Sequence, residues 1–457
     1  MYRDEVPLYG DLVEIVNSVD ASVLATRNKN LGDLPVRHQI ERHGAIRLGT
    51  AYEMRMISRL FALLGMHPVG YYDLKMVGFP LHGTAFRPTC EESLRRNPFR
   101  VFTTVLRPDL ISSASVRETA TKILANRRLF SPRLCDLIDK AEESKEELTE
   151  RDAEELITES LKIFKWHSRA TVSLQTYLNL KREHPMVADI VCFPSAHINH
   201  LTPRTLDIDA VQAEMVRQGM PAKECIEGPP RGRKCEILLR QTSFKALEER
   251  VAFVDPDRPA YSVVNGTHTA RFGEVEQRGA AVTKKGRELY DRLLTSAVEA
   301  TEEAAKLGFD NVLAEAFREY PDDWTELRRR ELVYFRYRVP DRLSTSDRQA
   351  KLDSISAKSG ILHLEQLLES GFVECEPITY EDFLPLSAAG IFESNLGSGS
   401  ENTERKLQKT KQGSRRELEG VLGRTIPSEI DMYDRLQASS IRECEEKLGL
   451  ERILLKA

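Results

Sequence analysis

The 457-residue sequence lacks the features that mark membrane proteins and nucleic-acid-binding proteins. It contains no uninterrupted apolar run of about 18 residues, the length at which a membrane-spanning helix is expected. Its 66 basic side chains are outnumbered by 71 acidic ones, so the net charge is −5 and no broad basic field favours a nucleic-acid partner. We therefore expect a protein that binds neither membranes nor nucleic acids.

Cysteine is also scarce, with seven residues scattered along the chain and no C-x-x-C pair. An odd number without paired spacing does not suit a disulfide framework, which indicates a reducing compartment. The first residues carry acidic side chains and lack the apolar core of a signal peptide. The sequence therefore predicts a cytoplasmic protein, and its composition leaves the oligomeric state open.

What the chain does contain is enough apolar material, 41% of its residues, for two or three domains. Apolar residues at helical spacing near the start are followed by a candidate strand at 42–48 and a helix over 51–66. Short strand-like runs then continue to residue 107. We therefore expect residues 1–112 to hold an N-terminal helix and a first strand-rich module.

Residues 113–183 differ from their neighbours because charges alternate and glycine is rare. Apolar residues at helical spacing, such as Ile157 and Leu161, predict a mostly helical insertion here. Residues 184–345 return to a strand-rich pattern, which predicts a second module. Within it, the short apolar run at 187–193 is expected to form a buried strand.

The remaining residues, 346–457, are expected to form a C-terminal segment of their own. A run at 397–416 is rich in glycine, serine and charged residues, which is typical of a solvated loop without chemistry. The end of the chain returns to amphipathic helical spacing, with Ile430, Tyr433 and Leu436 aligned.

Two of the ten histidines stand in a repeated pattern, because His43 precedes Arg47, and His200 precedes Arg204, by four residues. Strand alternation puts His43 and Arg47 on one face, which leaves room for a small anionic ligand between a metal ion and a guanidinium. His197 would face the opposite side of a strand from His200 and is the weaker ligand candidate. The other histidines are expected to be surface or hydrogen-bonded structural residues: His38, His67, His82, His167, His184, His268 and His363.

An acidic pattern lies further along the chain, where Phe272, Glu274 and Glu276 share one face of an expected strand. Carboxylates on a sheet normally face water, so either this face is solvated or one carboxylate points inward and binds a cation. Two neutral imidazoles and one carboxylate form a facial triad suited to iron(II) and oxygen chemistry, and zinc is chemically possible. Gln241 and Ser243, on one face of another expected strand, are either substrate contacts or partners in ordinary sheet hydrogen bonding.

Several segments, among them residues 41–50, 198–204, 271–279 and 382–397, resemble one enzyme family, and the resemblance spans nearly the whole chain. This is the 2-oxoadipate dioxygenase/decarboxylase family, also called D-2-hydroxyglutarate synthase, which is similar to the vicinal-oxygen-chelate enzymes. The resemblance implies an α+β fold, in which a curled β-sheet barrel is built from two βαβββ modules with large helical insertions.

The resemblance also implies a metal site in which His43, His200 and Glu274 hold iron(II). Glu274 is preferred because the sequence Glu-Val-Glu-Gln-Arg that starts there resembles the Glu-x-x-Gln-Arg ligand run of hydroxyphenylpyruvate dioxygenases. Glu276 stays as the alternative ligand. Arg47 matches the arginine that in this family binds the distal carboxylate of the substrate, as its planar fork would allow.

Further substrate contacts are implied near the C-terminus. Residues 384–392 resemble the part of the family's chain that covers the substrate pocket, in which Leu386 and Ser387 would touch the bound acid. Leu386 stands where many members of the family have valine.

The implied reaction is the iron(II)-dependent conversion of 2-oxoadipate and O2 to 2-hydroxyglutarate and CO2, a step typical of lysine catabolism. Two other interpretations of the residues stay open. A redox-inert metal could act as a Lewis acid in a vicinal-oxygen-chelate lyase or isomerase, or the modules could bind a small molecule without catalysis.

Overall fold

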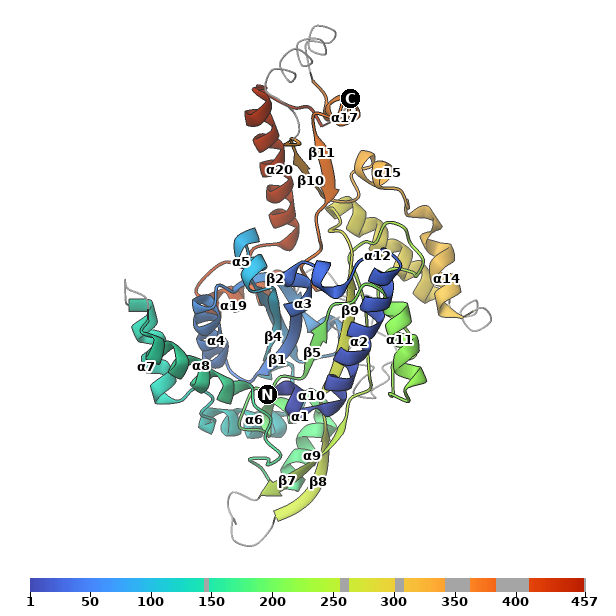
Figure 1. Cartoon of the computed structure of the whole chain (residues 1–457). Helices are drawn as coiled ribbons and strands as arrows, with labels where there is room; N and C mark the ends of the chain where they lie inside the picture. Colours follow the sequence, from blue (N-terminus) through green and yellow to red (C-terminus); the bar gives the residue numbers. More distant parts are fainter. Residues whose placement is uncertain (144–147, 255–262, 301–307, 342–361, 384–410, 456–457) are drawn as a thin grey trace. The chain divides into compact units, whose positions relative to one another are not determined.

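The computed structural model describes residues 1–143, 148–254, 263–300, 308–341, 362–383 and 411–455 (Figure 1). Its mixed helices and strands confirm the α+β class. The chain divides into two compact units. The first comprises Met1–Glu227, Arg240–Gln277 and Asp382–Pro427, and the second comprises Gly228–Leu239, Arg278–Glu381 and Ser428–Ala457. The predicted second module, 184–345, is therefore split between the two units.

A seven-stranded sheet forms the centre of the first unit, in the order β2-β3-β4-β1-β5-β9-β6. Strand β1 runs parallel to β4 and antiparallel to β5, and β5 runs parallel to β9. The strands are β1 (Arg42–Leu48), β2 (His67–Asp73), β3 (Leu81–Arg87), β4 (Phe99–Leu106), β5 (His200–Pro203), β6 (Leu239–Ser243) and β9 (Phe272–Arg278).

The first half of the sheet has the element order strand, helix and three strands. Helix α4 (Ala51–Leu63) follows β1, and β2, β3 and β4 complete the half-sheet as antiparallel neighbours. The helix begins where it does because Thr50 accepts a hydrogen bond from the Glu53 backbone, and the Glu53 side chain accepts from the Thr50 backbone in return. This half therefore has the βαβββ order expected of a module.

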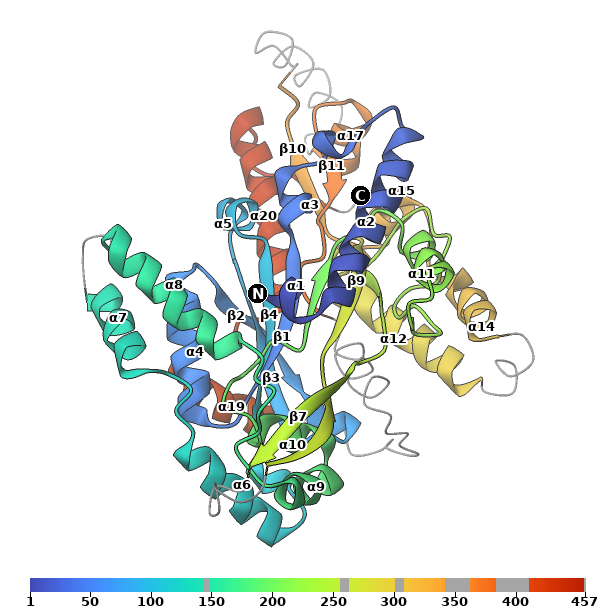
Figure 2. The ribbon, with the colours of Figure 1, turned by 60° about the horizontal axis from the view of Figure 1, so that its bottom comes forward.

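The second half departs from that order. Strand β5, helix α11 (Ile208–Arg217), β6 and β9 follow the same plan, but β7 (Glu248–Val254) and β8 (Val263–Thr269) form a separate two-stranded sheet, and Ala252 of β7 also bridges to Arg169. Figure 2 shows this hairpin extending beyond the main sheet toward α9 (Leu174–Glu183), where the Tyr177 hydroxyl donates to the Thr267 carbonyl. The second half of the sheet thus contains three strands, and the β7–β8 hairpin lies outside it.

The insertion after β4 is helical, as its pattern indicates. Residues 113–183 contain α6 (Ala114–Asn126), α7 (Pro132–Glu143), α8 (Glu150–Phe164) and α9 (Leu174–Glu183), and α10 (Pro185–Val191) continues the helical region beyond the predicted end of the insertion.

The strand expected at 187–193 is wrong, because most of that run lies in α10. The His184 imidazole accepts a hydrogen bond from the Met186 backbone, and Pro185 occupies the first helical position. Residues 186–191 are all buried, so apolar and polar residues do not alternate with the period of either a helix or a strand.

The two faces of the first strand pack into different cores. Ala45 belongs to a cluster with α9 and α10, whereas Ile46 and Leu48 pack with α4 and α7 on the other side. The N-terminal helix α2 (Pro7–Ala25) adds a third cluster against α11 and β9. The alternation expected over 42–48 is therefore real.

The second unit combines helices with a two-stranded sheet. Its elements include α12 (Lys284–Glu299), α14 (Phe309–Ala316), α15 (Trp324–Arg329), β10 (Phe335–Arg338), α17 (Leu364–Glu369), β11 (Glu374–Pro377) and α20 (Glu429–Leu448). The last of these confirms the amphipathic helix expected near the C-terminus. No helix in the described ranges is both long and apolar enough to cross a membrane.

The solvated loop expected at 397–416 is wrong for its last six residues, which lie in α19 (Lys411–Leu422) of the first unit. Leu418 and Leu422 of this helix are buried in the cluster around α4, and that packing outweighs the polar composition of the preceding turns. Residues 397–410 lie outside the described part of the chain.

Candidate metal centre

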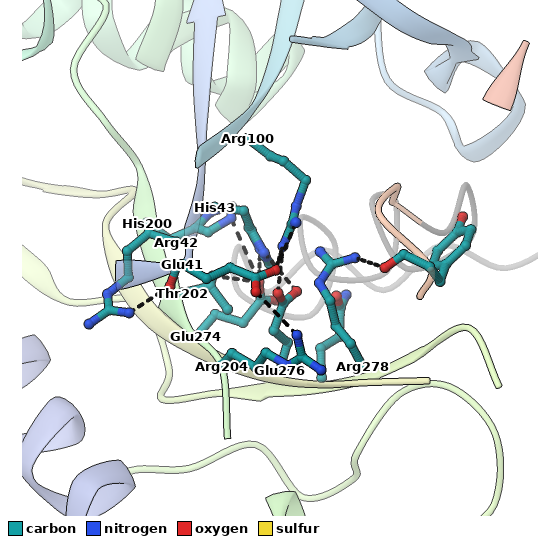
Figure 3. Close-up of polar contacts among 12 residues, drawn as sticks. Glu41, Arg42, His43, Arg100, His200, Thr202, Arg204, Glu274, Glu276 and Arg278 are labelled. Atoms are coloured by element: carbon teal, nitrogen blue, oxygen red, sulfur yellow. Dashed lines mark hydrogen bonds and ion pairs between the residues drawn. The ribbon is translucent and has the colours of Figure 1, made fainter. Parts of the chain in front are cut away.

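Three side chains from adjacent strands meet in the first unit. His43 on β1, His200 on β5 and Glu274 on β9 each offer one ligand atom, and these atoms all lie within 4.8 Å of one another (Figure 3). His43 Nε2 lies 2.6 Å, and His200 Nε2 lies 3.8 Å, from Oε2 of Glu274. All three side chains are buried. The three ligand candidates come from distant segments of the sequence, and the structure places them in one compact group.

Strand register explains why these residues meet. His43 pairs with Thr202 across the antiparallel β1–β5 seam, and His200 pairs with Phe272 across the parallel β5–β9 seam. Gly44 allows the close approach of β1 and β5, because a Cβ there would lie 3.0 Å from the His200 carbonyl oxygen. The three ligand candidates consequently face the same side of the sheet.

The group has the properties of a cation site. Glu274 Oε1 and His200 Nδ1 are buried without a hydrogen-bond partner in the described residues. A buried carboxylate oxygen without a partner is costly, and a divalent cation would satisfy it. Two imidazoles and one carboxylate that leave further positions open suit iron(II) or zinc.

The surrounding charges and burial favour a neutral imidazole at His200 and a protonated imidazole at His43. Burial, followed by the nearby charges of His43 and Arg47, holds the pKa of His200 well below its ordinary value. Burial would also lower the pKa of His43, but the carboxylates of Glu276 and Glu274 outweigh it and raise that pKa. A metal ion would take the place of the proton that His43 shares with Glu274.

Glu276 lies on the other side of the His43 ring. Its Oε2 is 2.8 Å from His43 Nδ1, and its Oε1 accepts a 2.8 Å hydrogen bond from Arg100. Arg100 also donates to Glu41, which accepts in turn from Arg204 at 3.2 Å (Figure 3). The arginine that follows His200 by four residues therefore joins a structural network and does not repeat the position of Arg47.

Arg47 is buried near the end of β1 and pairs with an acid that the sequence did not single out. Its Nη1 donates to Oδ2 of Asp189 on α10 at 2.5 Å. Asp189 also lies beside His197 and His268, in a second buried group of ligand-type residues. His197 is therefore in a different cluster from His200. The sequence signal that could have indicated this cluster is Asp189 itself, a single acidic residue within the apolar run of α10.

Gln241 and Ser243 lie on β6 with two polar neighbours that sequence reasoning missed. Gln241 Nε2 donates to Glu227 at 3.2 Å, and Glu227 accepts from Lys223 at 2.9 Å. Burial raises the pKa of Glu227 against the effect of Lys223, and Glu274 is close enough to add to that rise. The Ser243 hydroxyl is buried without a partner in the described residues.

Leu386 and Ser387 lie outside the described residues, but the two residues at the start of their segment are well anchored. Asp382 accepts from Arg87 Nε at 2.6 Å and from its Nη2 at 3.0 Å. The Phe383 ring lies 4.9 Å from that of His43, and the Phe383 carbonyl accepts from the Tyr72 hydroxyl.

Comparison with known families identifies the group to which this site belongs. A sequence profile described as 2-oxoadipate dioxygenase/decarboxylase matches residues 1–395. The chain belongs to the 2-oxoadipate dioxygenase/decarboxylase family. The resemblance drawn from the sequence is therefore confirmed.

Relatives within this family cover almost the full chain. A 2-oxoadipate dioxygenase/decarboxylase from Escherichia coli (strain K12) is 46% identical over 97% of this chain and 95% of its own. The Pseudomonas putida enzyme of the same name is 44% identical over 98% of this chain and 95% of its own. A crystal structure of the Pseudomonas putida hydroxyglutarate synthase in complex with 2-oxoadipate aligns with a TM-score of 0.82 and 42% identity. That alignment covers 98% of this chain and 96% of the other.

Proposed function

We propose that this protein is an iron(II)-dependent enzyme that converts 2-oxoadipate and O2 to 2-hydroxyglutarate and CO2. Membership of the 2-oxoadipate dioxygenase/decarboxylase family supports the reaction. The observation that carries the proposal is the buried group of His43, His200 and Glu274, because it joins the ligand types of a facial triad on three neighbouring strands.

The metal would be held by these three residues, with Glu276 orienting His43 from outside the ligand set. Iron(II) would supply the activation of O2, by which one oxygen atom converts the ketone carbon to a carboxylate as CO2 leaves and the other hydroxylates the next carbon. The chain itself would supply ligation, orientation and the exclusion of water. Phe383 contributes to that exclusion, because its ring packs against both His43 and Phe102.

Arg47 would bind the distal carboxylate of the substrate. Alternation along β1 puts its side chain on the same face as His43, so a linear diacid could reach from the metal to the guanidinium. Fixing both ends of the acid presents one carbon to the oxidant, which is how orientation lowers the barrier. Leu386 and Ser387 would touch the bound acid from the segment after Phe383.

Gln241 and Ser243 would line the other side of the pocket. The Ser243 hydroxyl is buried. The Gln241 side chain donates a hydrogen bond to Glu227, whose pKa is raised by burial and, to a smaller extent, by the charge of Glu274. Both are suited to hydrogen bonds with substrate oxygen atoms.

The fold would be of the vicinal-oxygen-chelate type, with one imidazole from each half of the sheet. Two features support this architecture: the βαβββ order of the first half, and the matching parallel pairs β1–β4 and β5–β9 around the central β1–β5 seam.

The proposal is tested by loading the purified chain with iron(II) without oxygen, adding 2-oxoadipate, and then admitting O2. We expect one CO2 and one 2-hydroxyglutarate for each O2 consumed, with no added reductant. A product formed without O2 uptake would indicate Lewis-acid chemistry, and no metal-dependent product would reject the enzyme function. The variants His43→Ala, His200→Ala and Glu274→Ala should each lose both the metal and turnover.

A further inference from the structure

A second group of two histidines and one acid lies in the first unit. Asp189 on α10 is approached by His268 Nε2 at 2.9 Å and by His197 Nε2 at 3.1 Å, both at Oδ1. Its other oxygen, Oδ2, accepts from Arg47 Nη1 at 2.5 Å. The Tyr177 hydroxyl lies 3.0 Å from His268 Nδ1, so the ring is held at both nitrogens. All these side chains are buried.

Aromatic rings surround this group, and the Arg271 guanidinium lies 4.5 Å from the centroid of one of them, Trp166. The Trp166 ring lies 4.7 Å from that of His197 and stacks on that of His268 at 6.0 Å. The Phe193 ring lies 4.7 Å from His268. A charged pair in such surroundings interacts more strongly than it would in water, and its members have few alternative positions.

The residue types alone would suit a second metal ion, but the charges do not. Arg47 already sets a permanent positive charge against Asp189, and a divalent cation at Oδ1 would lie close to that guanidinium. The first group differs, because Glu274 has ion pairs only with His43 and His200 among the described residues. Burial by itself would raise the pKa of Asp189, but Arg47 and then His197 hold it well below its usual range.

We propose that Asp189, His197 and His268 form a positioning site that fixes the guanidinium of Arg47, and thereby sets the preference for dicarboxylic over monocarboxylic 2-oxo acids. The inference rests on the proposed function, in which Arg47 binds the distal carboxylate. Asp189 Oδ2 accepts from Nη1 and so holds one edge of the planar guanidinium, whose N–H donors lie in a fixed geometry. His268 holds the Asp189 carboxylate through a hydrogen bond, and Tyr177 fixes His268 at its other ring nitrogen, whereas His197 is in ion-pair distance of the same carboxylate oxygen.

This arrangement has a defined effect on the substrate. An arginine that is held in one orientation loses little conformational freedom when it binds a carboxylate, so more of the interaction appears as affinity. A monocarboxylic 2-oxo acid of the same length makes no contact with Arg47 through its far end. Loosening the arginine should therefore weaken the diacid selectively.

The test compares 2-oxoadipate with 2-oxohexanoate in the iron(II)-loaded full chain. In Asp189→Asn we expect the ratio of kcat/KM for the diacid to that for the monoacid to fall by about tenfold or more, mainly through KM for 2-oxoadipate. His268→Gln and Tyr177→Phe should lower the same ratio by smaller factors. Asp209→Asn is the matched control, because Asp209 pairs with Arg240 at the same 2.5 Å in the same unit, and should leave the ratio unchanged.

Metal content provides an independent measurement, with one ion per chain expected in the wild type and in Asp189→Asn. Two ions in the wild type and one in the variant would overturn the proposal in favour of a second metal site. If Asp189→Asn does not fold, His268→Gln and Tyr177→Phe decide the matter, and an unchanged ratio in any folded variant of the cluster overturns the inference. Wild-type protein without 2-oxoadipate turnover would overturn the proposed function as well, so the two failures are distinguishable.

Discussion

Nδ1 of His43 lies 2.8 Å from Oε2 of Glu276, on the side of the ring away from Nε2, which lies 2.6 Å from Glu274. A carboxylate at Nδ1 keeps the proton of the neutral imidazole on that atom and leaves the Nε2 lone pair for a metal ion. Glu276 is held in turn by Arg100, which is fully buried. The two acids of the Glu-Val-Glu run therefore lie at different nitrogens of the His43 ring, and we expect them to have different tasks.

The first prediction separates those tasks. Glu276→Gln should lower metal affinity by about 10–100-fold, because the orienting carboxylate is lost while the ligand set stays complete. Glu274→Gln should abolish tight binding. Cobalt(II) titration against a competing chelator measures both. Glu53→Gln, which weakens another buried Glu–Arg pair, is the control and should bind cobalt like the wild type. Equal affinity of Glu276→Gln and the wild type would contradict the assignment.

The second prediction concerns the chemistry of residue 47. Arg47→Lys keeps the charge but loses the planar fork, so KM for 2-oxoadipate should rise by about tenfold or more, with a smaller change in kcat. Metal content should stay at the wild-type level, because Arg47 is not among the three ligand candidates. Steady-state kinetics with metal analysis on the same samples checks both statements. Loss of metal in this variant would contradict the proposal that Arg47 binds the substrate and takes no part in holding the metal.

The third prediction concerns the ion pair between Arg87 and Asp382, both of which are buried. Asp382→Ala leaves a buried guanidinium without its carboxylate, and should lower the free energy of unfolding by about 3–5 kcal/mol. Glu319→Gln removes the negative charge from an exposed pair with Arg292, and should lower the free energy of unfolding far less than Asp382→Ala does. Urea unfolding followed by circular dichroism compares the two variants. If both variants lost a similar amount of unfolding free energy, burial of the Arg87–Asp382 pair would not explain its contribution to stability.

The fourth prediction follows from the cap of α10. Burial, together with the charge of Arg47, lowers the pKa of His184 to about 4. The folded chain therefore binds this proton more weakly than the unfolded chain, and the free energy of unfolding falls as the pH drops through the ordinary histidine pKa toward 4. Because His184 is partly exposed, we expect its share of the loss between pH 7 and pH 5 to be about 1–2 kcal/mol.

His184→Asn isolates that contribution. Asparagine can accept the Met186 hydrogen bond and does not titrate, so the variant should keep the helix cap and lose part of the pH dependence. Urea unfolding at pH 5, 6 and 7 measures the slopes. Parallel slopes for variant and wild type would assign the pH dependence to other groups.

The sequence predicted the strands that carry the metal candidates better than the helix that supports Arg47. Alternation over 42–48 and the acidic run after Phe272 are local patterns, and each corresponds to a strand of the sheet. The meeting of His43, His200 and Glu274 depends on strand order, which no local pattern contains. The resemblance to a family supplied that information.

The Asp189 cluster was missed for a physical reason. A fully buried helix shows no amphipathic period, so the run at 187–193 could equally be a strand. The cap formed by His184 and Pro185 was the available signal for a helix. Asp189 is 142 residues from Arg47, and their contact follows only from packing the helical insertion against β1.

The three metal candidates occupy positions 43, 200 and 274 of a 457-residue chain, so no short stretch of it contains even two of them. During translation, a nascent polypeptide that has not yet reached Glu274 presents imidazoles without their carboxylate, and strand β9 that would align them is missing. With the proposed ligand set, metal loading would wait until more than half of the protein has been synthesised and its distant strands have joined. A product terminated before that point would have no complete ligand set to fill, however much iron the cell provides.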